Sequence, residues 1–231
     1  MKIPGGAAFH DSIADVWDSR YERVGFKKRL RSFVSLFDQF VEPGQIWLDL
    51  GCGSGVLSSE LIKRGAQVVA FDGSPSMLAA AKRALCDYGN VVSFQQGDAQ
   101  NLSWSGSCAF DGVLCSSVVE YVEDPYELIR EVGRVLKDDG LLIISIPTKK
   151  SLIRSVQKLL RPVIRIFGTD KYSYFDFSRF EIDSSAVTDW LKKVNLQLEH
   201  ISGFDPLIPK NFHPILPPAL LICIGRKFKK A

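Results

Sequence analysis

Residues 47–55, WLDLGCGSG, join a short apolar run to a turn with three glycines at alternate positions. A helical pattern follows directly, from Val56 to Arg64. A buried parallel strand that enters a glycine-rich turn and then a helix commonly binds an adenosine-containing ligand, because the start of the helix directs N–H groups at it. Glycine also permits backbone angles closed to other residues and lets the main chain approach the ligand. The stretch therefore predicts a doubly wound α/β fold.

The spacing of the glycines separates two classes of ligand. The dinucleotide fingerprint is G-x-G-x-x-G, whereas this turn has Gly51, Gly53 and Gly55, with Val56 at the third fingerprint position. Asp49 stands just before the turn, where a carboxylate would repel a pyrophosphate but could bind an ammonium group. The pattern therefore favours a zwitterionic amino-acid ligand over a dinucleotide.

With these features the stretch resembles the first motif of the class I S-adenosylmethionine-dependent methyltransferases, which reads much like LDLGCGSG. Within that class the chain resembles methyltransferase type 11 and the ubiquinone-biosynthesis O-methyltransferases. The resemblance covers roughly residues 45–147 and extends more loosely through 196–202. It implies S-adenosylmethionine as cofactor, S-adenosylhomocysteine as product, and a Rossmann-like seven-stranded sheet whose last strand is antiparallel. Two alternatives stay open, an NAD-dependent oxidoreductase and a non-catalytic cofactor-binding protein.

Composition places the chain among ordinary globular proteins. It has 231 residues, 46% of them hydrophobic and 24% charged, and its formal net charge of +3 is too small to imply nucleic acid. The five cysteines show no C-x-x-C pair and no histidines at zinc spacing, so we expect reduced thiols and a cytoplasmic protein. Residues 1–12 lack the apolar run of a signal peptide, and no apolar stretch approaches the roughly 18 residues that span a bilayer. We expect one domain over residues 1–231.

Short apolar segments alternate with amphipathic helical patterns along the chain. The predicted strands are 46–50, 67–71, 91–95, 111–115, 141–146, 196–202 and 219–225, and the predicted helices are 56–64, 75–87, 125–137 and 184–194. Before them, residues 9–41 read as helical and form most of a predicted cap, 1–41. This alternation predicts a parallel sheet covered on both faces. Ligands of such sheets bind beyond the carboxyl ends of the strands, so site residues should follow each strand.

Acidic residues follow the predicted strands in the order that the resembling family uses. Asp72 lies 21 positions after Gly51 and offers two acceptor oxygens to the ribose hydroxyls, while Ser74 can cap the next helix. In the family, an Asp at the position of Asp98 accepts from the adenine amino group. The expected cofactor-binding residues are Tyr21, Asp49, Gly51, Cys52, Gly53, Gly55, Asp72, Gly73, Met77, Asp98, Ala99, Cys115 and Ser116.

Residues 115–125, CSSVVEYVEDP, follow the fourth strand, where acceptor and methyl group should meet. They resemble the E-H-V-x-D-P segment of ubiquinone- and menaquinone-pathway methyltransferases, with Tyr121 in place of the histidine. The quinone O-methyltransferases carry an earlier Glu that helps hold a metal, and Ser117 aligns with it. Of the two glutamates and one histidine that the family has in this segment, only Glu120 remains, so no metal is expected. The favoured reaction is O-methylation of an aromatic or lipid-like hydroxyl on a small molecule, with N- or C-methylation as the alternative.

A general base is needed only when the acceptor atom carries a proton. The candidates for catalysis are Glu120, Tyr121, His10 and His213. His200 falls in the middle of a predicted strand and is expected to be structural. The predicted cap could also place Arg20, Tyr21 or Arg29 near the methionine carboxylate, as helices before the first strand often do in this family.

Residues 151–167, SLIRSVQKLLRPVIRIF, form a strongly amphipathic stretch within a predicted lid insertion, 148–183. At about 100° per residue, Arg154, Lys158, Arg161 and Arg165 share one narrow wedge, opposite the apolar residues. Pro162 should kink or split this helix. Two interpretations stay open. In the first, the apolar face of the lid covers the active site. In the second, the lid also contacts a lipid-like substrate or the anionic surface on the inner face of the membrane. The sequence does not indicate the oligomeric state.

Overall fold

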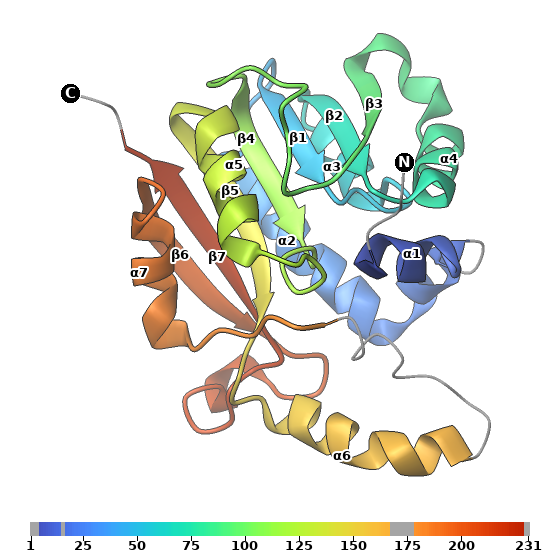
Figure 1. Cartoon of the computed structure of the whole chain (residues 1–231), viewed down its shortest axis with the longest axis vertical. Coiled ribbons are helices and arrows are strands. Elements are labelled where there is room, and N and C mark those ends of the chain that lie inside the picture. The colour runs from blue at the N-terminus through green and yellow to red at the C-terminus, as the bar shows by residue number, and fades with distance from the viewer. Residues whose placement is uncertain (1–4, 15–16, 167–177, 229–231) are drawn as a thin grey trace.

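The computed structural model describes residues 5–14, 17–166 and 178–228, and a seven-stranded sheet forms its centre (Figure 1). The strands are β1 (Ile46–Leu50), β2 (Gln67–Asp72), β3 (Val92–Gln96), β4 (Phe110–Ser116), β5 (Leu136–Pro147), β6 (Leu196–Phe204) and β7 (Leu220–Lys227). Their order is β3-β2-β1-β4-β5-β7-β6. The first five run parallel, and β7 is antiparallel to both of its neighbours. The predicted α/β class, with its antiparallel last strand, is confirmed.

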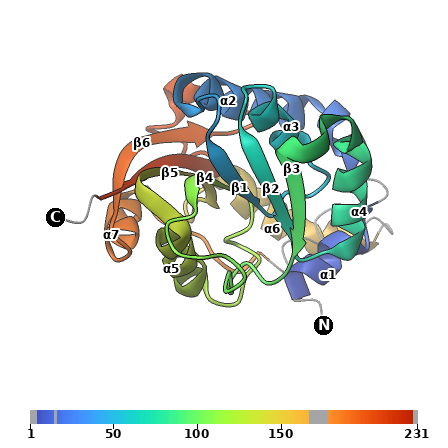
Figure 2. The same ribbon diagram turned by 90° about the horizontal axis from the view of Figure 1, so that it is seen from above.

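Helices cover both faces of this sheet, as Figure 2 shows from above. The α-helices are α1 (Gly5–Asp11), α2 (Val24–Phe40), α3 (Val56–Ile62), α4 (Pro75–Ala84), α5 (Pro125–Val135), α6 (Leu152–Ile166) and α7 (Val187–Lys192). The 3-10 turns are η2 (Asp18–Glu22), η3 (Cys86–Val91), η5 (Ser184–Ala186) and η6 (Lys210–Phe212). Phe33 and Phe37 of α2 pack with Trp47 on one face, while Leu128 and Val132 of α5 belong to the core of the other. Strands covered on both sides explain why the central strand sequences are almost continuously apolar.

The start of the chain departs from the predicted helical stretch 9–41. α1 already begins at Gly5 and ends at Asp11, and η2 follows it. Arg23 then has extended backbone angles, with φ −71° and ψ 142°, which separates η2 from α2. The mixed three- and four-residue spacing of apolar side chains did not reveal this break, because both flanking segments are helical.

Several predicted helix ends differ from the structure: the helices predicted over 56–64, 125–137 and 184–194 end at Ile62, Val135 and Lys192. The helix predicted over 75–87 ends at Ala84, and the 3-10 turn that follows contains Gly89 at φ 58°. At Pro162, where we expected a kink or a split, α6 is not split and runs as one element through that residue. Proline removes one helical hydrogen bond, here the one that the Lys158 carbonyl would accept, and the helix continues without it. The rest of the predicted lid, 167–177, lies outside the described residues.

Candidate functional site

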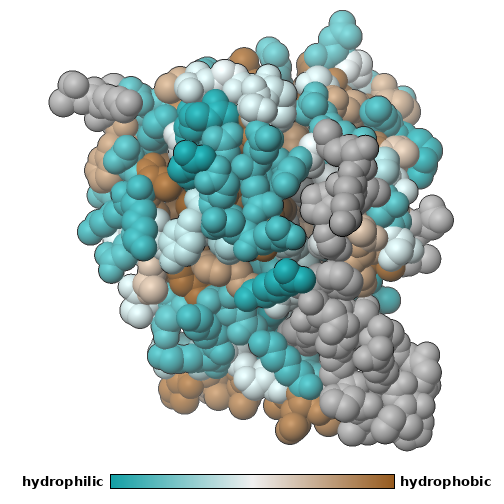
Figure 3. Space-filling model, viewed as in Figure 1, coloured by the Kyte–Doolittle hydropathy of each residue, from teal (hydrophilic) through white to brown (hydrophobic). Residues whose placement is uncertain are grey.

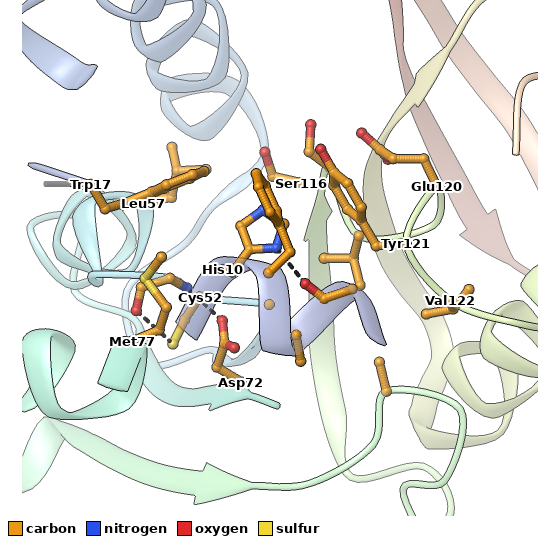
Figure 4. Close-up of a pocket in the computed structure, with 18 of the residues that line it drawn as sticks. His10, Trp17, Cys52, Leu57, Asp72, Met77, Ser116, Glu120, Tyr121 and Val122 are labelled. Carbon is orange, nitrogen blue, oxygen red and sulfur yellow. Dashed lines mark hydrogen bonds between the residues drawn. The ribbon is translucent and has the colours of Figure 1, made fainter. Parts of the chain in front are cut away.

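A cavity of about 480 Å³ lies at the carboxyl ends of the parallel strands, beside the glycine turn. Its walls come from α1, η2, α2, the glycine turn, the loops after β2, β3 and β4, and the first turns of α6. Figure 4 shows the part that surrounds the glycine turn and the loop after β4. This is the edge of the sheet where the topology predicts ligands to bind. All the predicted site residues line it except Gly55, Cys115 and His213.

The glycine turn has a conformation that other residues rarely adopt. Gly51 and Gly53 have φ 79° and 54°, and the main-chain N–H groups of Gly51 and Cys52 donate to the Phe71 carbonyl over 2.8 and 2.9 Å. A Cβ atom on Gly51 would lie 2.2 Å from Cγ2 of Val118. The turn is therefore held against β2 on one side and, on the other, against the loop after β4, residues 117–124, which we call the substrate loop after its predicted role.

Two buried carboxyl groups flank this turn. Asp49 is 1% exposed, and its Oδ2 accepts a hydrogen bond from Oγ of Ser58 over 2.6 Å. Burial, with a smaller contribution from the charge of Asp72, raises the pKa of Asp49 to about 7. Asp72 accepts from the N–H groups of Gly53 and Ser74, each over 2.9 Å, and burial raises its pKa as well. Asp72 thus fixes the glycine turn relative to the end of β2.

The loops after β2 and β3 complete this side of the cavity. Ser74 caps α4 by accepting from the N–H of Met77 over 3.0 Å, which confirms the predicted cap, and the Met77 side chain is 1% exposed. Asp98 accepts from the main-chain and side-chain nitrogens of Gln100 over 2.9 and 3.1 Å, beside Ala99. These contacts fix the direction of the Asp98 carboxylate at the cavity edge.

α1 covers the cavity from the amino-terminal side. Its last residue, Asp11, accepts from Oγ of Ser74 over 2.6 Å and from the N–H of Ser76 over 3.0 Å. In Figure 4 the His10 ring of α1 faces Tyr121, and their centroids are 4.7 Å apart. Desolvation lowers the pKa of His10, so its imidazole is neutral near pH 7. A Cβ atom on Gly6 would lie 2.7 Å from Tyr121, so α1 rests directly on the substrate loop.

The aromatic residues of η2 and its surroundings also border the cavity. The ring of Trp17 lies 5.2 Å from that of His10, and the Arg20 guanidinium lies 4.8 Å from the centre of the Trp17 ring. Tyr21 packs edge-to-face against Phe26 at 5.5 Å. The predicted cofactor residue Tyr21 therefore lies among the aromatic side chains that border the cavity.

A cluster of serines surrounds the one arginine that α2 contributes to the cavity. Nη2 of Arg29 donates to the hydroxyls of Ser116, Ser117 and Ser145 over 2.8, 2.7 and 3.1 Å. Oγ of Ser145 also accepts from the N–H of Ser117 over 2.9 Å, where the backbone has φ 57°. Within the described ranges, Arg29 forms no ion pair with a carboxylate. Ser145 could not be predicted as a site residue, because a single serine in the middle of an apolar strand does not indicate a functional site.

Glu120, in the loop after β4, is a buried acid that lines the cavity. Its side chain is 3% exposed, and its Oε2 has no hydrogen-bond partner among the residues that the structure describes. Burial raises the pKa of Glu120, and the nearby charges of Arg29 and Arg154 oppose that rise. The N–H of Arg179 donates to the Glu120 carbonyl over 2.7 Å, which holds the substrate loop to the segment after α6. A carboxyl group with a free oxygen can accept a proton from a molecule in the cavity.

Three predicted residues stand outside the cavity. Gly55, at φ 84°, begins α3, and a Cβ atom there would lie 2.9 Å from Leu85. Cys115 is fully buried within β4. Nε2 of His213 lies 3.1 Å from the Ile208 carbonyl, in the loop before β7. Ser116 follows Cys115 and lines the cavity, as Gly53 and Leu57 do on either side of Gly55. The residues nearest to His213 in sequence that line it are Pro206 and Ala219.

α6 presents an unexpected face to the cavity. Arg154 is 7% exposed, and it borders the cavity together with Ile153 and Gln157. Most of the apolar side is instead exposed: Leu152, Val156, Leu159 and Leu160 are 52%, 44%, 76% and 46% exposed. The expectation that the apolar face covers the active site is therefore wrong for these four residues. The side chains of Arg161 and Arg165 lie outside the described residues.

The described residues provide neither a cluster of metal ligands nor a membrane-spanning helix. No group of three or more His, Cys, Asp or Glu side chains is placed there to hold a metal ion. No helix in those ranges combines the length and apolar character needed to cross a bilayer.

Comparison with known proteins shows that this chain is similar to methyltransferases. A methyltransferase domain model matches residues 48–144. The chain is 30% identical over 199 residues to a ubiquinone biosynthesis O-methyltransferase from Xanthomonas axonopodis pv. citri, an alignment that covers 84% of this chain and 82% of that protein.

Solved structures share the fold. A magnesium protoporphyrin IX methyltransferase from Synechocystis with bound S-adenosylhomocysteine superposes with a TM-score of 0.67 at 22% identity, covering 91% of this chain and 87% of that one. A chain from the complex of a Haloferax volcanii methyltransferase activator with a methyltransferase gives a TM-score of 0.72 at 20% identity, covering 95% and 98%. At these identities the likeness concerns the fold alone.

Proposed function

The chain belongs to the S-adenosylmethionine-dependent methyltransferases, and from that premise we propose that it methylates a hydroxyl group of an aromatic or lipid-like small molecule. Family membership removes the NAD-dependent oxidoreductase from consideration. Oxygen is favoured over nitrogen or carbon as the acceptor atom because the curated relatives are named O-methyltransferases. The cavity supplies a second argument, a buried acid suited to remove a hydroxyl proton.

The residues around the glycine turn fit this cofactor. When bound, S-adenosylmethionine supplies a methyl group on a positively charged sulfur, already activated for displacement. Each oxygen of Asp72 holds one main-chain N–H and keeps a further lone pair, so it could also accept from a ribose hydroxyl. Asp49 would face the ammonium group. Arg29, whose hydrogen bonds within the described ranges all go to serine hydroxyls, would face the methionine carboxylate.

The proposed role of Glu120 carries the choice of O-methylation. A hydroxyl attacks a methyl group well only as its proton leaves, so a base within hydrogen-bond reach lowers the barrier. Glu120 borders the cavity, is almost fully buried, and keeps Oε2 unpaired. Because burial raises its pKa, its carboxylate is a stronger base than an exposed one. His10 is neutral and could serve as a second base, with Tyr121 packed against it.

Glu120→Gln tests this role, because it keeps the shape of the side chain and removes the base. We expect kcat for a catechol probe to fall by about 10²–10⁴, while the Kd for S-adenosylhomocysteine changes less than about twofold. Glu127→Gln, on the surface of α5, is the matched control and should leave both quantities unchanged. Equal kcat for Glu120→Gln and wild type would contradict the assignment.

The exposed side of α6 favours contact with a membrane surface. Besides its four exposed apolar side chains, the loop before β7 exposes Leu207, Phe212 and Ile215, by 77%, 48% and 79%. Figure 3 shows apolar surface along the lower edge of the molecule, where Figure 1 places this loop and α6. Lys150 and Lys158 are exposed at the same edge. Apolar side chains beside lysines are typical of a surface that adsorbs to anionic lipids.

Sedimentation with phosphatidylglycerol vesicles tests the membrane contact. Wild-type protein should sediment with them, and added salt should reduce the bound fraction. Leu159→Glu should abolish most of the binding, because it places a charge in the apolar face. Val24→Glu is the matched control, since Val24 is 70% exposed on α2. Equal binding by Leu159→Glu and wild type would rule this surface out.

A further inference from the structure

An exposed thiol and a buried amine meet at the edge of the sheet that lies away from the cavity. Cys108 precedes β4, and Lys227 is the last residue of the antiparallel strand β7. Figure 1 shows β7 ending on the side of the sheet away from α6. Nζ of Lys227 lies 3.8 Å from Sγ of Cys108, although the two residues are 119 positions apart in the sequence. Neither residue lines the cavity, so the pair is separate from the site described above.

Lys227 has no acidic partner among the residues that the structure describes, although its side chain is buried. The residue is 8% exposed, and its Nζ donates to the Leu136 carbonyl over 2.5 Å. Its other hydrogen-bond partner in those ranges is the sulfur of Cys108. Lysine is almost never buried unless it is paired, because burying its charge is costly. The amine is therefore held against the sulfur by its surroundings and is screened from other reactants.

Cys108 is fixed by its main chain but open to small molecules. Its N–H donates to the Arg134 carbonyl over 3.0 Å, and the N–H of Ala109 donates to the Val135 carbonyl over 2.8 Å. The cysteine is a free thiol with an exposed side chain, so a dissolved oxidant can reach the sulfur. Two groups that the fold holds in contact react far more readily than the same groups free in solution.

We propose that Cys108 and Lys227 form a covalent sulfur–nitrogen bridge when the protein meets hydrogen peroxide. In the first step the Cys108 sulfur attacks the peroxide, two electrons pass from sulfur into the O–O bond as it breaks, and a sulfenic acid and water form. In the second step the Lys227 ammonium releases a proton, and the neutral amine attacks the sulfur. The N–S bond forms as the S–O bond breaks, and a second molecule of water leaves.

The bridge joins strands that are not neighbours. β5 lies between β4 and β7 in the sheet, so a bond from Cys108 to Lys227 ties three strands together at one edge. A cross-link between residues far apart in sequence reduces the conformational freedom of the unfolded chain, so the oxidised protein should unfold at a higher temperature. The cavity lies at the opposite ends of β4 and β5, so cofactor binding should not change.

Peptide mass mapping of the full-length protein tests the bridge. Folded protein is treated with hydrogen peroxide, its remaining thiols are alkylated, and a digest is analysed by tandem mass spectrometry. The expected product joins the peptides of Cys108 and Lys227 at a mass about 2 Da below their sum, and dithiothreitol should separate them again. Protein oxidised in urea should not give this product, because the contact exists only in the folded chain.

Two variants separate the bridge from ordinary thiol oxidation. Lys227→Arg keeps the positive charge and removes the primary amine, so it should form no bridge and should leave at Cys108 a sulfenic acid that dimedone traps. Cys86→Ser is the matched control, because Cys86 is also exposed but its sulfur lies 3.6 Å from a carboxylate oxygen of Asp87 instead of an amine. This variant should form the bridge as wild type does.

The outcomes are distinct from those that bear on the proposed function. Oxidised wild type should melt at least about 5 °C above reduced wild type, and oxidation of Lys227→Arg should give no such rise. Folded wild type in which Cys108 stays unmodified, or carries only a sulfenic or sulfinic acid, overturns the proposal. A bridge that forms equally well in urea also overturns it. Failure of the untreated protein to bind S-adenosylhomocysteine would count against the methyltransferase function and would leave the bridge standing.

Discussion

Replacing Gly51 by alanine perturbs the glycine turn at its tightest point. The residue has φ 79°, and a new Cβ atom would lie 2.2 Å from Cγ2 of Val118. The left-handed conformation costs a residue with a Cβ atom about 1–2 kcal/mol. Moving the Val118 side chain from its preferred rotamer adds about 0.5–1.5 kcal/mol. Gly51→Ala should therefore lower the free energy of unfolding by about 1.5–3.5 kcal/mol.

Gly44→Ala is the matched control for this substitution. Gly44 has φ 85°, and nothing lies within 4 Å of the position its Cβ atom would take. Gly44→Ala should lower the free energy of unfolding only by the cost of the left-handed conformation, about 1–2 kcal/mol. This corresponds to a fall in Tm of about 2–8 °C for a chain of this size. The two variants differ in what they do to the cavity, because only Gly51 belongs to its wall.

The assay measures both stability and cofactor binding. Urea unfolding gives the loss of stability, and titration calorimetry with S-adenosylhomocysteine gives Kd. Gly51→Ala should raise Kd at least tenfold, since the main chain moves away from the ligand, while Gly44→Ala should leave Kd unchanged. If both variants bind S-adenosylhomocysteine as wild type does, the glycine turn is not the cofactor site.

Two further substitutions test charges that hold the site. The pKa of Asp49 is raised from 3.8 to about 7, so between these values the native chain holds one more proton than the unfolded chain. Stability should fall by up to about 4 kcal/mol as pH rises from about 4 to about 7, and Asp49→Asn should remove this slope in urea unfolding. Asp11→Ala removes the two hydrogen bonds that tie α1 to α4. It should speed amide hydrogen exchange in α1 about tenfold, as expected for a loss of about 1.4 kcal/mol, and unchanged exchange would show that α1 is held otherwise.

Much of the fold could be predicted because its signals are local. Apolar strands such as Trp47–Leu50, glycine turns and helix starts such as Ser74-Pro75 involve residues close in sequence. The order of the site residues along the chain follows from the topology, since each parallel strand delivers its loop to the same edge. Asp72 and Asp98 therefore appear where sequence alone placed them.

The orientation of α6 could not be predicted, because an amphipathic pattern defines two faces without saying which one meets the protein. Here the partner of Arg154 is Glu181, 27 residues further along the chain. Burial of the basic side depends on that distant carboxylate, and no periodicity in 151–167 reveals it. Arg179 lies in a stretch of sequence without a helical or strand pattern, so its position at the cavity could not be predicted.

The serine cluster illustrates the same limit. Ser145 interrupts the apolar sequence of β5 and reads as a neutral core residue. Its role depends on Arg29 and Ser117, which α2 and the loop after β4 bring to it from distant parts of the sequence. Side chains that act by meeting non-local partners leave no mark in the spacing of their own element.

A crystal structure of the chain with S-adenosylhomocysteine tests most directly whether this cavity is the methyl-transfer site. The ribose hydroxyls should lie within hydrogen-bond distance of Asp72, the adenine should lie beside Asp98, and the sulfur should face the space between Tyr121 and Glu120. An empty cavity in crystals grown at saturating ligand, or a nucleoside with its adenine against Glu120, would contradict this arrangement.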